Sequence, residues 1–86
     1  MHCLLIYDIP DDATRNKVAD FCLDYGLDRI QYSAFLGELS FNHMQELMKK
    51  IRSKISTQPA KVLLVPLPAD AWEKRLIHET KSQSRP

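Results

Sequence analysis

The sequence predicts an α+β fold in which two helices pack on one face of a mainly antiparallel sheet. Two stretches carry apolar residues at helical spacing behind a capping side chain, and the stretches around them have the short apolar runs or the alternation of strands. In chain order these elements give β-α-β-β-α-β. With 86 residues, the chain has room for one small core, so association with a second chain would add useful burial.

The first strand is expected at residues 3–7, where an apolar run leads to Asp8 and is stopped by Pro10. A helix over residues 12–25 follows, because its apolar residues recur at helical spacing between a capping residue and a glycine. The cap is Asp11 or Asp12, and the glycine is Gly26.

Residues 29–36 alternate between two sets of side chains, as a strand does. A compact domain of this size favours two short strands over one long strand, yet no glycine or proline marks a bend. One predicted face carries Ile30, Tyr32, Ala34 and Leu36, and the other carries Arg29, Gln31, Ser33 and Phe35.

A second helix is expected after Ser40 or Asn42, either of which can serve as its N-cap. It is amphipathic, and cations gather at its C-terminal end, where they suit the negative end of the helix dipole. Its apolar stripe consists of Met44, Leu47, Met48, Ile51 and Ile55, and its cations are Lys49, Lys50, Arg52 and Lys54.

The apolar run at residues 62–65 predicts a strand buried on both faces, which Pro66 and Pro68 are expected to end. Residues 69–80 fit either a helix or an edge strand. We favour a short turn followed by an extra C-terminal strand.

This order of elements is the ferredoxin-like arrangement, here with an extra C-terminal strand. Residues 1–80 are expected to form a single domain and residues 81–86 a flexible C-terminal tail. The fold hosts many unrelated functions and decides none of them alone.

Several classes of protein are excluded by what the sequence lacks. The two glycines form no phosphate-binding loop, the three histidines have no second ligand at zinc spacing, and Ser33 has no histidine or lysine near it in a nucleophile motif. No stretch approaches the length of a membrane span, and none has the pattern of a signal peptide. Cys3 and Cys22 lack metal-ligand spacing, so we expect a cytoplasmic protein with reduced cysteines.

Asp8 is the only acid at the end of a predicted core strand. A carboxylate at the rim of a core loses hydration and needs a cation or hydrogen-bond donors in return. Two interpretations stay open from position alone, a metal or catalytic role and a structural cap of the next helix. One carboxylate does not hold Mg²⁺ alone, so the first requires a two-fold dimer that brings two Asp8 side chains together.

Polar and aromatic residues near Asp8 are candidates for nucleic-acid contacts. Phosphate contacts are expected from the cations and the amide, base stacking or packing from Phe35, and packing with a minor substrate contact from the Tyr7 hydroxyl. The candidate cations and the amide are Arg15, Lys17, Arg29 and Gln31.

Taken in order, several stretches resemble the CRISPR-associated Cas2 family. The most specific are the Tyr7-Asp8 strand end and the Arg-Ile-Gln-Tyr-Ser-x-Phe stretch at residues 29–35, and the resemblance extends to about Ile77. The other stretches that carry it are Asp11-Asp12, residues 15–19, residues 25–28 and residues 62–67.

The resemblance implies a homodimer in which the C-terminal strand of each chain joins the sheet across the interface. It also implies that Asp8 is the metal-binding carboxylate, with Mg²⁺ or Mn²⁺ shared between two protomers, and that Tyr7 is its strand neighbour. The surrounding positions, which contact substrate or stabilise the site, are Arg15, Lys17, Arg29 and Phe35. Together with Gln31, expected from its position alone, Tyr7 and these four residues are the candidate nucleic-acid contacts.

The activity implied by the resemblance is a metal-dependent endonuclease of CRISPR spacer acquisition, which cleaves RNA or DNA phosphodiester bonds. The alternative is a non-catalytic dimeric scaffold that binds duplex DNA and bridges subunits of the Cas1 integrase.

Overall fold

Strands and helices follow one another in the order that the sequence predicts, in a computed structural model that describes residues 1–80. The expected tail, residues 81–86, lies outside the described residues. The β-α-β-β-α-β order is thereby confirmed. The elements are β1 (His2–Asp8), α1 (Asp12–Asp24), β2 (Asp28–Gln31), β3 (Ala34–Glu38), α2 (Phe41–Ile55) and β4 (Lys61–Leu67).

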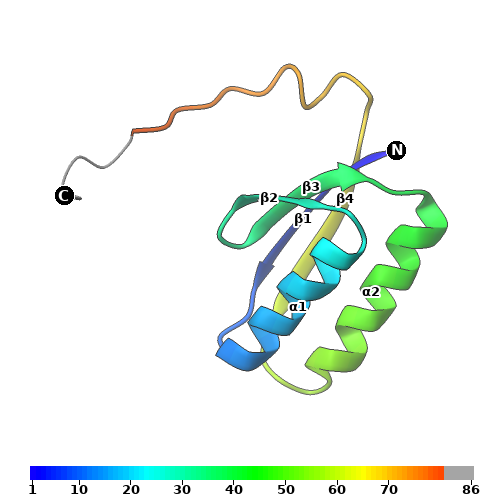
Figure 1. Cartoon of the computed structure of the whole chain (residues 1–86), viewed down its shortest axis with the longest axis vertical. Coiled ribbons are helices and arrows are strands. Elements are labelled where there is room, and N and C mark those ends of the chain that lie inside the picture. The colour runs from blue at the N-terminus through cyan, green and yellow to red at the C-terminus, as the bar shows by residue number, and fades with distance from the viewer. Residues whose placement is uncertain (81–86) are drawn as a thin grey trace.

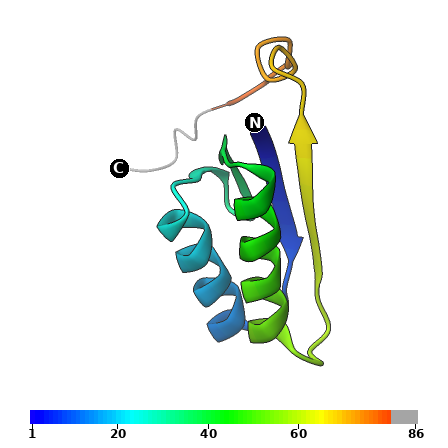
Figure 2. The ribbon, with the colours of Figure 1, turned by 90° about the vertical axis from the view of Figure 1, so that its right-hand side faces the viewer.

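The four strands form one antiparallel sheet in the order β2-β3-β1-β4. Both helices cover the same side of this sheet, as Figure 1 and Figure 2 show. We call that side the helix face and the opposite side the open face. In β1, which lies between β3 and β4, successive side chains alternate between the helix face and the open face.

The core lies between the sheet and the helices. Cys3, Leu5 and Tyr7 of β1 point into it and are at most 7% exposed. Phe35 of β3 aligns with Leu5 across the ladder and is fully buried. The helices contribute the fully buried side chains of Val18, Cys22, Leu47 and Ile51.

Both ends of α1 have the predicted local contacts. Asp11 is its N-cap, and the Asp11 carboxylate accepts a 2.9 Å hydrogen bond from the Thr14 N–H, which lowers the pKa of that carboxyl. At the other end, Gly26 has a φ of 83°. The Leu27 N–H then donates to the Cys22 carbonyl at 3.1 Å, which completes a Schellman motif.

The amphipathic pattern of α2 is confirmed. Its N-cap is Ser40, the first of the two expected candidates, and the Ser40 Oγ accepts a 3.1 Å hydrogen bond from the His43 N–H. Met44, Leu47 and Ile51 of its apolar stripe are buried against the sheet. Neither helix in residues 1–80 is long and apolar enough to cross a membrane.

The alternating stretch at residues 29–36 folds back on itself, as expected for a compact domain. The bend falls at Tyr32 and Ser33, without a glycine or proline. The Tyr7 N–H donates to the Ser33 carbonyl at 3.1 Å. The central strand therefore holds the turn through a contact that is not visible in the local sequence.

The predicted face of Gln31 is wrong. A bulge between Arg29 and Gln31 shifts the register of β2 against β3. Arg29 still aligns with Phe35 on the helix face, but Gln31 aligns with Ala34 and lies with the open-face residues. Strict alternation holds only while a strand stays regular, and the bulge ends that regularity.

The prediction that β4 is buried on both faces is also wrong, because β4 is an edge strand. On its open-face side, Leu63 and Val65 are 44% and 40% exposed. A continuous apolar run does not distinguish a central strand from an edge strand that has one uncovered face.

Pro66 lies within β4 rather than after it. Met1 and Tyr7 form backbone hydrogen bonds towards the β3 side. The odd-numbered residues of β1 therefore direct their backbone N–H and C=O groups to β3, and the even-numbered residues direct theirs to β4. Pro66 aligns with Cys3, and its nitrogen therefore lies on the outer edge. An edge strand tolerates proline there because no ladder bond is lost.

The segment after β4 makes the expected turn but not the expected extra strand. Turns occupy residues 69–74, and residues 75–80 pair with no strand of the described chain. Leu76 is fully exposed and Ile77 is 72% exposed. A strand needs a free edge alongside it, whereas this segment runs beyond the end of β4 and away from the two helices (Figure 1).

Gly37 is required by a close approach between β3 and the residue that follows α1. A Cβ built on Gly37 would lie 2.6 Å from Leu27 Cδ2 and 3.2 Å from Leu27 Cα. We expect Gly37→Ala to lower the free energy of unfolding by about 1–3 kcal/mol through overpacking. Urea unfolding followed by circular dichroism measures this change.

Leu27→Val in the same chain removes the nearest clashing atom and is expected to recover part of the loss. Gly26→Ala is the comparison, because a Cβ there meets nothing within 4 Å and only the positive φ is strained. An unfolding midpoint for Gly37→Ala equal to that of the unaltered protein would contradict this account.

Candidate functional site

Asp8 ends β1 on the open face of the sheet. It follows Tyr7, which points into the core, so the alternation of β1 turns its carboxylate outwards, where it is exposed. Asp8 aligns across the ladder with Lys61, the first residue of β4. We call the space at this end of the sheet the Asp8 hollow; its volume is about 220 Å³, and it is lined by Ile6, Tyr7, Asp8, Lys61 and Leu63.

The interpretation of Asp8 as the cap of the next helix is wrong, because the N-cap of α1 is Asp11. Within residues 1–80, no cation lies within 4 Å of the Asp8 carboxylate in an ion pair. Its oxygens are therefore free to accept a ligand from outside the chain.

A single chain does not supply a complete metal site. No group of three His, Cys, Asp or Glu side chains that could hold an ion occurs among the described residues. Magnesium is usually bound through one or two carboxylates, with waters and substrate phosphates completing its shell. One exposed carboxylate without an internal partner fits half of such a site, and a second copy of the chain would supply the other half.

Arg15, a predicted nucleic-acid contact, holds the turn between β1 and α1. One guanidinium nitrogen donates to the carbonyls of Ile9 and Pro10, at 3.0 and 3.3 Å. The other nitrogen bonds the Asp12 carboxylate, which raises the pKa of Arg15 above its ordinary value. The side chain is 20% exposed, so much of it is committed to this turn.

Arg29 lies on the helix face among aromatic rings. Its guanidinium carbon is 5.1 Å from the centre of the Phe35 ring and 5.6 Å from that of Tyr32, and one nitrogen lies 3.4 Å from the Tyr7 hydroxyl. Arg15 also lies over Tyr32, at 5.6 Å. Two of the predicted cations thus meet at Tyr32, which the sequence pattern did not single out.

Of the two interpretations of Phe35, packing is confirmed and stacking on a base is wrong. Its ring is fully buried and stacks on the Tyr7 ring, with 6.1 Å between the ring centres. Tyr7 itself is 7% exposed. The two rings form the packed support beneath the end of β1 that carries Asp8.

The remaining predicted contacts lie apart from Asp8. Lys17 lies over the Phe21 ring at 5.5 Å, in the helix layer. Gln31 lies on the open face near Ile30. Of the predicted contacts, Tyr7 alone lines the Asp8 hollow, and the structure also brings Lys61 there, which sequence spacing did not indicate.

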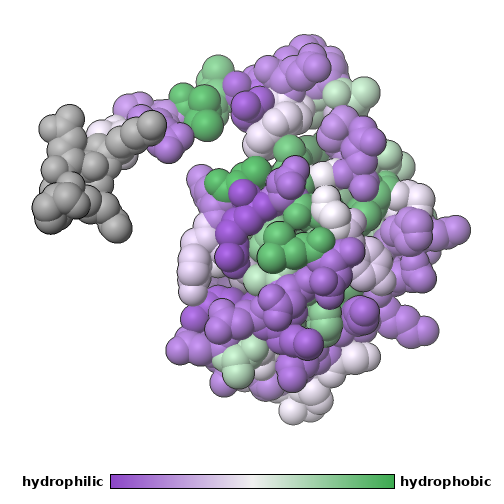
Figure 3. Space-filling view, in the orientation of Figure 1, coloured by the Kyte–Doolittle hydropathy of each residue, from purple (hydrophilic) through white to green (hydrophobic). Residues whose placement is uncertain are grey.

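The open face is apolar and uncovered by any element of residues 1–67. Alternation places aliphatic side chains from all four strands on it, and several are more than a third exposed. By contrast, Figure 3, which views the helix side, shows mostly hydrophilic residues with apolar ones between them. The exposed members are Ile6, Ile30, Leu63 and Val65. A pocket of about 440 Å³ lies between part of this face and the segment that follows β4, which contributes Trp72, Arg75, Leu76 and Ile77 to its lining.

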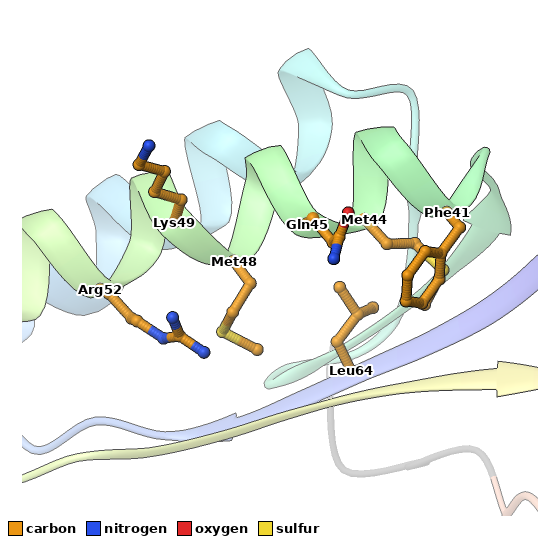
Figure 4. Close-up of a pocket in the computed structure, with 7 residues that line it drawn as sticks. All are labelled: Phe41, Met44, Gln45, Met48, Lys49, Arg52 and Leu64. Carbon is orange, nitrogen blue, oxygen red and sulfur yellow. The ribbon is translucent and has the colours of Figure 1, made fainter.

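A second groove lies between α2 and β4, on the helix face (Figure 4). It measures about 420 Å³ and contains no carboxylate, histidine or cysteine, so it lacks the usual side-chain ligands of a divalent metal ion. Its lining consists of Phe41, Met44, Gln45, Met48, Lys49, Arg52 and Leu64.

Known proteins resemble this chain over most of its length. A family model described as CRISPR associated protein Cas2 matches residues 1–75. A protein of Chloroflexus aurantiacus named CRISPR-associated endoribonuclease Cas2 2 is 49% identical over 79 residues, which cover 92% of this chain and 93% of that protein.

Two further similarities concern the fold and a fused relative. A crystal structure of Streptococcus pyogenes Cas2 matches with a TM-score of 0.78 and 21% identity, covering 93% of this chain and all of that one. A Thermoproteus tenax protein named as a fusion of CRISPR-associated endonuclease Cas1 and endonuclease Cas2 is 41% identical over 51 residues. That match covers 59% of this chain and 19% of the fusion.

The hydrogen bonds of Arg15 predict a structural effect when it is replaced. We expect Arg15→Gln to lower the urea midpoint of unfolding, because the Ile9 and Pro10 carbonyls lose a charged donor. Lys17→Gln is the matched control, since it removes the same charge from a side chain that lies over Phe21 instead of bonding the turn. Equal midpoints for the two variants, with weaker nucleic-acid binding by Arg15→Gln alone, would show a substrate contact instead.

Proposed function

This chain belongs to the CRISPR-associated protein Cas2 family, and on that premise we propose that it is a homodimeric nuclease of CRISPR spacer acquisition. In this proposal the dimer cleaves phosphodiester bonds in RNA or DNA, using a divalent cation shared between two Asp8 carboxylates. The observation that carries this proposal is the position of Asp8. Its carboxylate is exposed on the open face beside an apolar surface, and it forms no ion pair within residues 1–80.

The open face supports the homodimer. An uncovered sheet face of aliphatic side chains is costly in water, and a second copy related by a two-fold axis would bury the same surface on both chains. The exposed Leu76 and Ile77 lie just beyond β4. In the dimer, residues 75–80 of each chain, which pair with no strand of their own chain, would pair with a sheet edge of the other chain.

The dimer also brings the two halves of the metal site together. Asp8 lies on the open face that would be shared, so each chain contributes one carboxylate to a single Mg²⁺ or Mn²⁺. When bound, the cation supplies charge neutralisation for a phosphodiester and activation of water for attack.

Side chains of the protein position this carboxylate and its substrate. The stacked Tyr7 and Phe35 rings fix the end of β1, and Arg15 fixes the turn that follows Asp8. Arg29, which is exposed at the β2 edge, is available to a phosphate beyond its aromatic contacts. Lys17 and Gln31 are exposed and offer further, weaker contacts to a bound strand.

A non-catalytic scaffold is the second candidate function. The name of the Thermoproteus tenax relative joins Cas1 and Cas2 in one chain, which favours a working association between the two. In this candidate the dimer binds duplex DNA and bridges Cas1 integrase subunits, so it needs affinity but no reaction at Asp8. Both candidates place the protein in the cytoplasm, in keeping with the buried free thiols of Cys3 and Cys22.

Replacement of Asp8 separates the two functions. For the nuclease, Asp8→Asn should lower Mg²⁺-dependent cleavage of RNA and duplex DNA by at least about 100-fold. Loss of a group that only orients a metal ligand costs roughly 10- to 100-fold in activity, and loss of the ligand itself costs more. Cleavage is followed on denaturing gels, and Cas1-assisted DNA insertion is measured with the same preparations. Asp20→Asn is the matched control, since Asp20 is an exposed acid of α1 outside the Asp8 hollow.

Loss of cleavage with insertion intact would establish two separable activities. Unchanged cleavage by Asp8→Asn would refute the metal role of Asp8. Absence of Mg²⁺-dependent cleavage in the unaltered dimer, with insertion intact, would leave the scaffold as the function of the protein.

A further inference from the structure

We propose that Lys61 binds a substrate phosphate beside Asp8 and positions the nucleic acid at this carboxylate. The inference rests on the proposed nucleic-acid function and assigns a residue to the Asp8 hollow that is 53 positions away from Asp8 in the sequence. Three features of the structure support it, namely the register of β1 against β4, the composition of the hollow, and the positions of the other cations.

The register fixes Lys61 beside Asp8. The two residues are direct partners in the antiparallel ladder, and side chains of such partners emerge on the same face with Cβ atoms about 4.5–5.5 Å apart. Both line the Asp8 hollow, together with Ile6 and Leu63. Ile6 and Leu63 are 37% and 44% exposed, so the hollow is open to a ligand that approaches from solvent.

The ammonium of Lys61 is free to bind a ligand. Among the ion pairs of residues 1–80, none within 4 Å involves Lys61. Lys61 also belongs to a stretch without acids, from Leu47 to Ala69. The acid that the register places beside Lys61 is Asp8, and these two charges form no ion pair within 4 Å, which leaves the ammonium available to an incoming phosphate.

The other candidate cations are placed elsewhere. Arg15 is bonded to the turn, Lys17 lies over Phe21 in the helix layer, and Arg29 lies over the aromatic rings of the helix face. Of the residues that line the Asp8 hollow, Lys61 alone carries a positive charge.

A cation is needed at this position for an electrostatic reason. The Asp8 carboxylate repels a phosphodiester, and a second carboxylate across a dimer axis would increase that repulsion. An ammonium on a flexible stem offsets this repulsion and adapts to the phosphate oxygens of any base sequence. Lys61 is therefore expected to contribute to affinity without reading sequence.

The experiment compares the dimers of Lys61→Gln, Lys61→Arg and Lys49→Gln. Binding of a short fluorescent RNA and of a duplex DNA is measured by anisotropy over a range of salt concentrations without divalent metal, so that the result does not depend on cleavage. Lys49→Gln is the matched control because it removes the same charge from α2, on the other side of the sheet (Figure 4).

We expect Lys61→Gln to weaken binding of at least one nucleic acid about fivefold to tenfold. The slope of log affinity against log salt concentration should fall in magnitude by about 1 for each phosphate that Lys61 neutralises in the unaltered dimer. Lys61→Arg should retain most of the affinity. Where the unaltered dimer cleaves, KM should rise more than kcat falls.

Equal binding by Lys61→Gln and Lys49→Gln, with equal salt slopes, would overturn the proposal. So would a Lys61→Gln variant whose only change is a weaker dimer in sedimentation, with normal binding at concentrations where the dimer persists. An unaltered protein that binds neither nucleic acid would instead overturn the proposed function. Cleavage lost by Asp8→Asn while Lys61→Gln binds normally would leave the nuclease intact without this role for Lys61.

Discussion

The alternation of β1 is the constraint on which the rest of the molecule depends. This strand is bonded on both sides, to β3 and β4, so it has no freedom to rotate or slip. Its odd-numbered residues must therefore fill the core, and its even-numbered residues must face outwards. The same pleat that buries Tyr7 exposes Asp8, so the stability of the core and the orientation of the candidate ligand have one origin.

The sheet separates two kinds of charge. On the helix face, Arg29 and Arg15 lie against Tyr32 in cation–π contacts, and Arg15 also bonds backbone carbonyls. On the open face, Asp8 and Lys61 lie among aliphatic side chains, and no ion pair within residues 1–80 fixes either charge. The first arrangement stabilises the end of the sheet, and the second leaves both charges available to a ligand.

Most of the fold follows from local patterns in the sequence, because caps, helical stripes and the glycine at the end of α1 act over a few residues. The errors arose where distant residues decide. The bulge that turns Gln31 is set by pairing with β3, the edge position of β4 follows from topology, and residues 75–80 pair with neither edge of their own sheet. Asp8 was identifiable as the end of a core strand, whereas Lys61 was not, because cross-strand register is absent from local spacing.

Pro66 limits how a further strand can add to the outer edge of β4. Its nitrogen lies on the outer edge of β4 and offers no donor, so a ladder along that edge is interrupted before the strand ends. An added strand could therefore bond this edge before Pro66, whereas a continuous ladder along the whole strand could not form. Proline at this position thus opposes edge-to-edge growth of the sheet, the route by which exposed apolar strands aggregate.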